Sequence, residues 1–214
     1  MDKRYAIFDM DGTLVDSMVY WKQLAGEFLR QKGVRHIPSN LLEQIKPMTI
    51  PEAMELFIQA FSLEGTPESL SAEANALMER HYREDIPLKP GIREYLAALD
   101  CAGVRMCVAS ATAEPLMRAC LKRLGVLDYF RFLLSCESVG AGKDRPDVYY
   151  AAVKQLDCAP CQAAVYEDAL YAAGTARKAG FYVVGVYDES AGDHWSQMKA
   201  LADETIFDFK EELL

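Results

Sequence analysis

The chain has 214 residues, of which 51% are hydrophobic and 26% charged, and its formal net charge at pH 7 is −9. That length suits one buried α/β domain, either alone or with a smaller inserted domain. An acidic chain without a basic cluster argues against nucleic acid or an anionic membrane surface as a partner. No apolar segment reaches the roughly 18 residues of a membrane-spanning helix, and the first residues lack the apolar core of a secretion signal.

Six cysteines lie between residues 101 and 161, several of them in apolar stretches where we expect them as small core residues. Cys158 and Cys161 have the spacing of a redox or metal site, but no second pair or histidine cluster accompanies them. We therefore interpret this segment as a helix-to-strand turn, and we expect a reduced, cytoplasmic protein.

The first predicted element is a buried strand over about residues 4–9. It leads into Asp-Met-Asp-Gly-Thr-Leu at residues 9–14, which places Asp9 and Asp11 two residues apart. Open α/β sheets bind ligands at the carboxyl ends of their strands. Two acids there can divide the work, one attacking or holding a metal while the other moves protons. Asp and Gly are also ordinary turn residues, so a simple turn is the alternative.

Residues 17–86 show only helical periodicity, with Gly33 ending a first helix and further helices starting near Pro51 and Pro67. The first helix carries an apolar stripe at helical spacing, which consists of Trp21, Leu24, Ala25, Phe28 and Leu29. We expect these residues to form an all-helical insertion.

Strands and helices alternate after residue 90. Strands are predicted near residues 104–109, 130–134, 163–166, 181–186 and 205–207. A helix at 92–101 precedes the first of them. The helices between the strands are predicted near 113–124, 147–156 and 169–179, with a weaker one before the last strand. This alternation predicts an α/β fold with a doubly wound parallel sheet, Rossmann-like, formed by residues 1–16 and 87–214. The helical domain, residues 17–86, is inserted after the first strand.

Further polar residues follow the later strands or their loops. Ser110 ends the strand at 104–109 and could bind a phosphate oxygen, although Ser is also a common helix cap. Lys143 lies on a glycine-rich loop, where a surface lysine is the plainer interpretation. Glu167 and Asp168 end the strand at 163–166, where they could also simply favour a helix N-terminus.

Together these residues resemble the four motifs of the haloacid dehalogenase-like hydrolase superfamily, in the expected order. Residues 9–14 resemble the first motif, Ser110 the second, Lys143 the third, and Glu167 with Asp168 the fourth. The helical insertion is similar to the family's helical, type-one cap domain, so the resemblance covers essentially the whole chain.

The resemblance implies a mechanism. Asp9 attacks phosphorus to form an aspartyl-phosphate, and Asp11 acts as general acid and then as general base. Mg²⁺ is held by Asp9, the backbone carbonyl of Asp11 and Asp168, with Glu167 as a further ligand or as the partner of Lys143. The phosphate-binding residues are Met10, Gly12, Ser110, Ala111 and Lys143. Gly12 permits the tight turn that brings backbone N–H groups near the phosphate, and closure of the cap excludes water.

The substrate is expected to be a small phosphorylated metabolite. A phosphatase is favoured over a β-phosphoglucomutase-like phosphomutase, because Trp21 and Ile50 stand where that mutase has a His and an Arg that grip its substrate. Asp11 argues against dehalogenases and phosphonoacetaldehyde hydrolases, which lack an acid there. A catalytically silent sensor of a phosphorylated metabolite is the non-enzymatic alternative.

Substrate contacts are expected from the first cap helix and from the loop at 46–49. The candidates are Tyr20, Trp21, Lys22 and Met48. Trp21 also fits the cap's own apolar stripe, which is the alternative interpretation. The three histidines, His36, His81 and His194, lack metal-ligand spacing and are expected at the surface or in turns.

Overall fold

The computed structural model describes residues 3–45, 48 and 50–213. The chain divides into two compact units. The first, here called the α/β unit, consists of Met1–Met18 and Ile86–Leu214, and the second, the helical unit, is Val19–Asp85.

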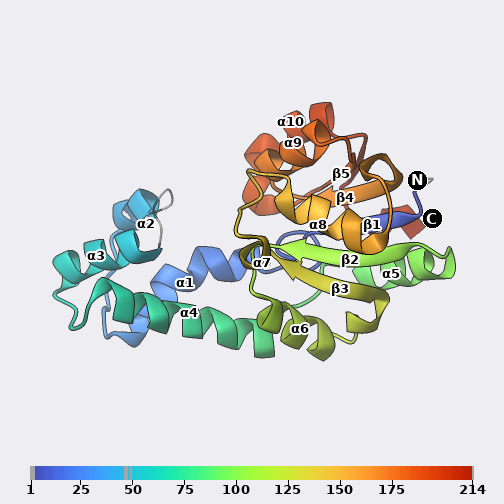
Figure 1. Ribbon diagram of the computed structural model, residues 1–214. Coiled ribbons are helices and arrows are strands. Elements are labelled where there is room, and N and C mark those ends of the chain that lie inside the picture. The colour runs from blue at the N-terminus through green and yellow to red at the C-terminus, as the bar shows by residue number, and fades with distance from the viewer. Residues whose placement is uncertain (1–2, 46–47, 49, 214) are drawn as a thin grey trace. The chain divides into compact units, whose positions relative to one another are not determined.

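Within the described residues, the α/β unit contains a six-stranded sheet in the order β3-β2-β1-β4-β5-β6 (Figure 1). Its strands are β1 (Tyr5–Phe8), β2 (Arg105–Ser110), β3 (Phe130–Ser135), β4 (Ala163–Glu167), β5 (Tyr182–Val186) and β6 (Glu204–Ile206). Each neighbouring pair is parallel. The predicted parallel α/β fold is therefore confirmed.

The sheet reverses its winding direction at β1, which places β1 between β2 and β4. Phe8, the last residue of β1, is in register with Val108 on one side and with Tyr166 on the other. In a sheet of this kind, the crevice outside the carboxyl ends of the strands at the reversal is where a ligand binds. The residues that follow β1 and β4 therefore occupy the position expected of a binding site.

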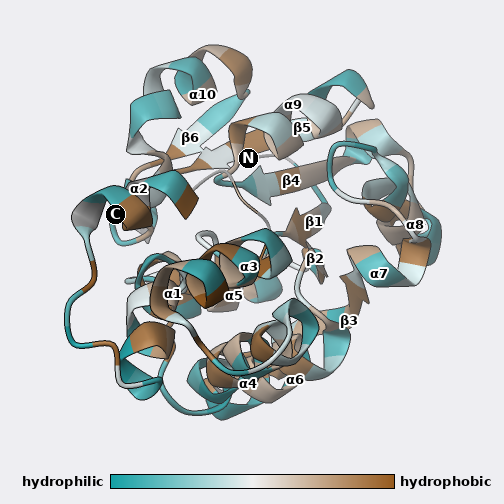
Figure 2. Cartoon of the chain, turned by 90° about the vertical axis from the view of Figure 1, so that its left-hand side faces the viewer, coloured by the Kyte–Doolittle hydropathy of each residue, from teal (hydrophilic) through white to brown (hydrophobic). Residues whose placement is uncertain are grey.

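Helices cover the sheet, and the inner strands are hydrophobic because both of their faces are buried (Figure 2). The helices are α5 (Ile92–Cys101), α6 (Glu114–Arg123), α7 (Cys136–Val139), α8 (Asp147–Leu156), α9 (Leu170–Lys178) and α10 (Trp195–Leu201). Short 3₁₀ turns occur at Leu127–Tyr129, Pro160–Gln162, Glu189–His194 and Glu211–Leu213. Cys158 and Cys161 lie in the connection between α8 and β4, as predicted, and both are free thiols.

The short helix α7 was not predicted. The Ser135 hydroxyl caps its start by accepting from the Glu137 N–H at 3.1 Å. Gly140, in a left-handed conformation with φ of 67°, ends it. This helix is one turn long, which is too short to produce a recognisable apolar period.

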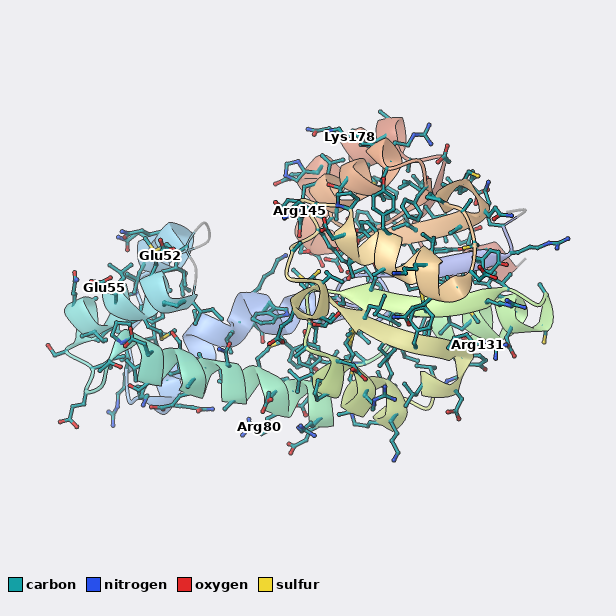
Figure 3. All side chains as sticks on the ribbon, viewed as in Figure 1. Glu52, Glu55, Arg80, Arg131, Arg145 and Lys178 are labelled. Carbon is teal, nitrogen blue, oxygen red and sulfur yellow. The ribbon has the colours of Figure 1, made fainter. Side chains whose placement is uncertain are left out.

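The helical unit contains α1 (Met18–Gln31), which starts at the boundary, and α2 (Ser39–Ile45), α3 (Ile50–Phe61) and α4 (Pro67–Glu84). Helix α3 buries Ala53, Met54 and Phe57, whereas Glu52 and Glu55 are exposed and point outward (Figure 3). The predicted helices are present, and the seven-residue α2 is an addition to them. None of the described helices is both long and apolar enough to span a membrane.

His81 is not at the surface, so that prediction was wrong. Its side chain is buried on α4, where Nδ1 lies 2.6 Å from Asp85 Oδ2 and Nε2 lies 2.8 Å from Glu27 Oε2. The ring also packs against Tyr20, with centroids 4.9 Å apart. Two acidic partners from α1 and from the end of α4 make burial of this polar ring tolerable.

Candidate active site

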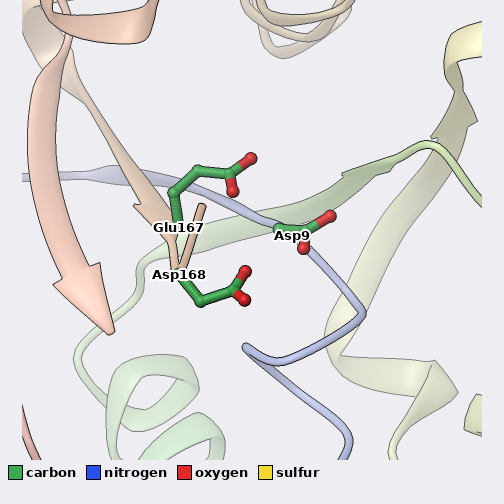
Figure 4. Close-up of side chains that lie close together, drawn as sticks. All are labelled: Asp9, Glu167 and Asp168. Carbon is green, nitrogen blue, oxygen red and sulfur yellow. The ribbon is translucent and has the colours of Figure 1, made fainter. Parts of the chain in front are cut away.

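Three carboxylates meet at the carboxyl ends of β1 and β4. Asp9 follows β1 and its N–H donates to the Tyr166 carbonyl at 3.0 Å, while Glu167 ends β4 and Asp168 follows it. One oxygen from each of the three carboxylates lies within 4.8 Å of the others (Figure 4). The adjacency of the two strands brings together acids that are almost 160 residues apart in the chain.

Lys143 lies against this cluster. It comes from the loop between α7 and α8, and its side chain is only 5% exposed. Its Nζ donates to Asp9 Oδ1 and, at 2.5 Å, to Glu167 Oε1. A lysine that is buried against two carboxylates is not an ordinary surface residue, so the plainer interpretation of Lys143 was wrong.

Glu167 uses its two carboxylate oxygens differently. Oε1 accepts from Lys143 and also from the Tyr149 hydroxyl at 2.8 Å. Oε2 is buried and accepts no hydrogen bond from any residue that the structure describes. A buried carboxylate oxygen without a donor is costly, and coordination of a cation would satisfy it.

The sequence assigned no function to Tyr149, although it lies in the predicted helix at 147–156 and in the segment 142–149 that resembles the family. It is the third residue of α8 and is almost fully buried. Burial and the negative charge of Glu167 raise the pKa of Tyr149 well above its usual value, so its hydroxyl remains a donor. The available signal was chemical, since a tyrosine on the buried face of a helix needs a partner for its hydroxyl.

Electrostatics in the cluster are dominated by burial and crowding of like charge. Burial, reinforced by Glu167 and Asp11 and opposed by Lys143, raises the pKa of Asp9 to about 7. Burial and the charges of Asp9 and Glu167 likewise raise the pKa of Asp168. Burial alone would lower the pKa of Lys143, but the two carboxylates that it contacts outweigh burial and raise it.

This donor set fits Mg²⁺. With all three acids ionised, the cluster carries −3, and the +1 of Lys143 leaves −2 (−3 + 1 = −2). A divalent cation would neutralise that remainder, and carboxylate oxygens are the hard ligands that Mg²⁺ prefers. The unpartnered Glu167 Oε2 supplies a ligand atom that no described donor already occupies.

Gly12 makes room for Asp168. Its φ of 77° is a conformation that favours glycine, and a Cβ placed on it would lie 2.3 Å from Asp168 Oδ2. The Gly12 N–H donates to the Val15 carbonyl at 3.0 Å, and phosphate binding by Met10 and Gly12 stays a prediction. The Met10 carbonyl closes the same turn by accepting from the N–H groups of Leu14 and Val15.

Asp11 lies beside the cluster with its side chain held by two hydroxyl groups. The Ser17 hydroxyl donates to Asp11 Oδ1 at 2.6 Å, and the Thr112 hydroxyl donates to Oδ2 at 2.5 Å. Asp11 is not one of the three carboxylates of the cluster, and the expected metal contact through its backbone carbonyl stays a prediction. Neither hydroxyl partner was predicted.

Ser110 ends β2, as predicted, and is 1% exposed. Its hydroxyl accepts from the Thr112 N–H at 3.1 Å, which stabilises the turn that presents Thr112 to Asp11. Ala111 lies exposed in this turn. Phosphate binding by Ser110 and Ala111 remains a prediction.

The residues predicted to contact the substrate all belong to the helical unit. Tyr20 packs on His81, and the Trp21 indole N–H donates to the Tyr82 hydroxyl at 3.2 Å. Trp21, Lys22 and Met48 line an apolar cavity of about 640 Å³ within that unit. Lys46 and Thr49, at the ends of the loop proposed for substrate contact, lie outside the described residues.

Comparisons with known proteins agree with the fold. The family model of the haloacid dehalogenase-like hydrolases matches residues 6–186. A phosphorylated carbohydrates phosphatase of Thermotoga maritima is 24% identical over 174 residues, which cover 81% of this chain and 80% of the relative. A beta-phosphoglucomutase of Bacillus subtilis is 27% identical over 195 residues, covering 84% and 81%.

A solved structure from Thermotoga maritima, provisionally described as a beta-phosphoglucomutase, has the same fold. It superposes with a TM-score of 0.83 and 22% sequence identity, covering 99% of this chain and all of the other. The family match spans most of the sequence and contains Asp9, Lys143 and Glu167. This chain therefore belongs to the haloacid dehalogenase-like hydrolase family.

Proposed function

We propose that this protein is a Mg²⁺-dependent phosphatase that hydrolyses the phosphomonoester of a small metabolite, such as a sugar phosphate. The observation that carries the proposal is the position of Asp9, which contacts Lys143 and lies within one carboxylate cluster with Glu167 and Asp168. Curated relatives named as phosphatases of small phosphorylated compounds support the choice of substrate class.

Asp9, Glu167 and Asp168 would hold the metal ion, together with the backbone carbonyl of Asp11. When bound, Mg²⁺ supplies positive charge against the phosphoryl oxygens. Lys143 adds a second positive charge at the same place, and the backbone and hydroxyl of Ser110 and the backbone of Ala111 would bind the remaining oxygens.

In the first half of the reaction, a carboxylate oxygen of Asp9 attacks phosphorus. The new bond joins this oxygen to phosphorus, and the bond from phosphorus to the ester oxygen breaks. Asp11 gives its proton to the departing ester oxygen, which leaves as an alcohol. The product on the enzyme is an aspartyl-phosphate on Asp9.

In the second half, Asp11 is a carboxylate and takes a proton from a water molecule. The water oxygen bonds to phosphorus while the bond from phosphorus to the Asp9 oxygen breaks, which releases phosphate and restores both acids. The hydroxyl groups of Ser17 and Thr112 hold Asp11 within the same turn as Asp9, in a fixed orientation between these steps.

A phosphatase is favoured over a phosphomutase by the helical unit. Trp21 and Ile50, which stand where the mutase has its gripping His and Arg, line the apolar cavity and offer no charge to a second phosphate. A bisphosphorylated intermediate would therefore lack a cation at these two positions to retain it.

The proposal is tested by phosphate release from a panel of phosphomonoesters with Mg²⁺. We expect release by the wild-type protein, loss of release in Asp9→Asn, and unchanged release in Asp128→Asn, an exposed acid outside the cluster. Loss in EDTA and recovery with Mg²⁺ are expected in the same assay.

Two results would overturn the proposal. Isomerisation of a hexose 1-phosphate without phosphate release, in the presence of the matching bisphosphate, would identify a mutase. Saturable binding of phosphomonoesters without turnover of any of them would identify a sensor.

A further inference from the structure

The Tyr149 hydroxyl and Lys143 Nζ converge on one oxygen of Glu167. The hydroxyl lies 2.8 Å from Oε1, the atom that also accepts from Lys143 at 2.5 Å. The Tyr149 ring lies beneath the same lysine, with Nζ 6.0 Å from its centroid. Tyr149 therefore contacts both members of this ion pair.

The other oxygen of Glu167, Oε2, is left without a hydrogen-bond donor among the described residues although it is fully buried. A carboxylate that rotates about its last torsion exchanges its two oxygens. Two donors fixed on Oε1 oppose that rotation and leave Oε2 as the oxygen that no described donor occupies. One oxygen of Glu167 lies within 4.8 Å of one oxygen from each of Asp9 and Asp168.

We propose that Tyr149 is a positioning residue that assigns the two oxygens of Glu167 to different tasks, Oε1 to Lys143 and Oε2 to the metal. The inference rests on the proposed Mg²⁺ site. It explains why a hydroxyl is placed at the buried start of α8, where a phenylalanine would fill the same space without any polar group to satisfy.

Helix α8 gives the hydroxyl its rigid support. Tyr149 is the third residue of this helix, and its ring packs against Phe181 with centroids 5.9 Å apart. A hydrogen-bond partner on a helix fixes the orientation of a metal-binding carboxylate better than a partner on a loop does. Loss of such a partner commonly weakens metal binding about 10- to 100-fold.

The test is calorimetric titration of the metal-free protein with Mg²⁺, without substrate. Tyr149→Phe keeps the ring and removes the hydroxyl, and we expect the dissociation constant for Mg²⁺ to rise about tenfold. The matched control is Tyr150→Phe, since Tyr150 is the next residue of α8 and is 46% exposed. We expect the control to bind Mg²⁺ as the wild type does.

A double variant separates positioning from general packing. If Tyr149 acts through Glu167, adding Tyr149→Phe to Glu167→Gln changes Mg²⁺ affinity no further. A merely structural tyrosine would lower the melting temperature of the metal-free protein but leave the affinity unchanged. An affinity of Tyr149→Phe within twofold of wild type therefore overturns the inference.

Ring-labelled tyrosine NMR of the wild-type protein provides the second measurement, should Tyr149→Phe fail to fold. We expect Mg²⁺ to shift the Tyr149 resonance and to leave that of Tyr150 in place, and an unmoved Tyr149 resonance contradicts the inference. Absence of phosphate release contradicts the proposed hydrolysis but leaves the comparison of Mg²⁺ binding between wild type and variants valid. A wild-type protein that binds no Mg²⁺ overturns both.

Discussion

Gly12 and Asp168 lie so close that no side chain fits between them. A Cβ on Gly12 would lie 2.3 Å from Asp168 Oδ2 and 2.7 Å from its Cγ, and Gly12 has a φ of 77°. The backbone of the turn after β1 therefore packs directly against the carboxylate of Asp168, which follows β4. The position of Asp168 in the carboxylate cluster depends on glycine at residue 12.

Gly12→Ala should therefore displace Asp168. We expect Mg²⁺ to raise the melting temperature of this variant much less than that of the wild type, and phosphate release to fall at least tenfold. The measurement is thermal unfolding with and without Mg²⁺, paired with the phosphate assay.

Gly180→Ala is the matched control for backbone strain. Gly180 has a φ of 88°, but no described atom lies within 4 Å of the position that a Cβ would take, so alanine there costs only the strain of about 1–2 kcal/mol. We expect a lower melting temperature with a normal response to Mg²⁺. If both variants respond alike, the contact with Asp168 is not the cause.

The raised pKa of Asp9 should make the proposed binding of Mg²⁺ depend on pH. Burial, the largest cause, raises this pKa from 3.8 to about 7 in the metal-free protein. Between these values the native state holds a proton that the unfolded chain has released, so metal-free stability falls as pH rises through this window. Mg²⁺ must displace that proton below about pH 7 and meets a carboxylate above it.

We therefore expect Mg²⁺ to raise the melting temperature more at pH 8 than at pH 6. Thermal unfolding in EDTA and in saturating Mg²⁺ at both values measures this, with NaCl at matched ionic strength as the control. An equal rise at pH 6 and pH 8 would show that Asp9 does not bind the ion as a carboxylate.

The sequence predicted the sheet well because parallel strands leave strong local signals. Apolar runs that alternate with helical patterns identified the strands from β1 to β6, and acids at the ends of parallel strands are expected to gather at one edge. Lys143 joined them through its resemblance to a family motif, since nothing in its own loop predicts burial.

The contacts that the sequence did not predict each include a residue whose neighbours in the sequence give no indication of its partner. Tyr149, Ser17 and Thr112 became functional candidates only through the register and packing that bring their hydroxyls to Glu167 and Asp11. A serine or threonine hydroxyl is compatible with many local structures, so its partner follows from tertiary structure alone. His81 was misjudged for the same reason, because its acids come from two helices.

Thr112 provides a test of how Asp11 is held. Thr112→Val keeps the shape of the side chain and removes the hydroxyl that donates to Asp11 Oδ2. We expect kcat to fall about tenfold, equivalent to ~1.4 kcal/mol, while the KM for a phosphomonoester changes little, because the proposed proton donor, Asp11, loses its orientation and substrate binding is unaffected.

Thr175→Val is the control for this substitution. Thr175 lies on α9 and its hydroxyl donates only to backbone carbonyls among its described contacts, those of Tyr171 and Asp144. We expect its steady-state kinetics to match wild type. A rise in KM without a change in kcat for Thr112→Val would instead place Thr112 in substrate binding.

His81 should make the stability of the helical unit depend on pH. Burial lowers the pKa of His81, but hydrogen bonds and charge from Asp85 and Glu27 outweigh burial and raise it above 6.5. Tyr20 packs against the ring, and Arg80 shares Glu27 at 3.5 Å. The stabilisation by charged His81 is thus complete below about pH 6.5 and is lost as pH rises through the raised pKa.

We expect His81→Gln to lower the free energy of unfolding by about 1.5–3 kcal/mol at pH 6, the usual range for hydrogen bonds to charged groups, and by less at pH 9. Urea denaturation followed by Trp21 fluorescence in a Trp195→Phe background measures it, since these are the two tryptophans of the chain. The exposed His36, substituted as His36→Gln, should show no such difference. A loss for His81→Gln that is the same at both pH values would mean that the neutral ring, and not its charge, joins α1 to the end of α4.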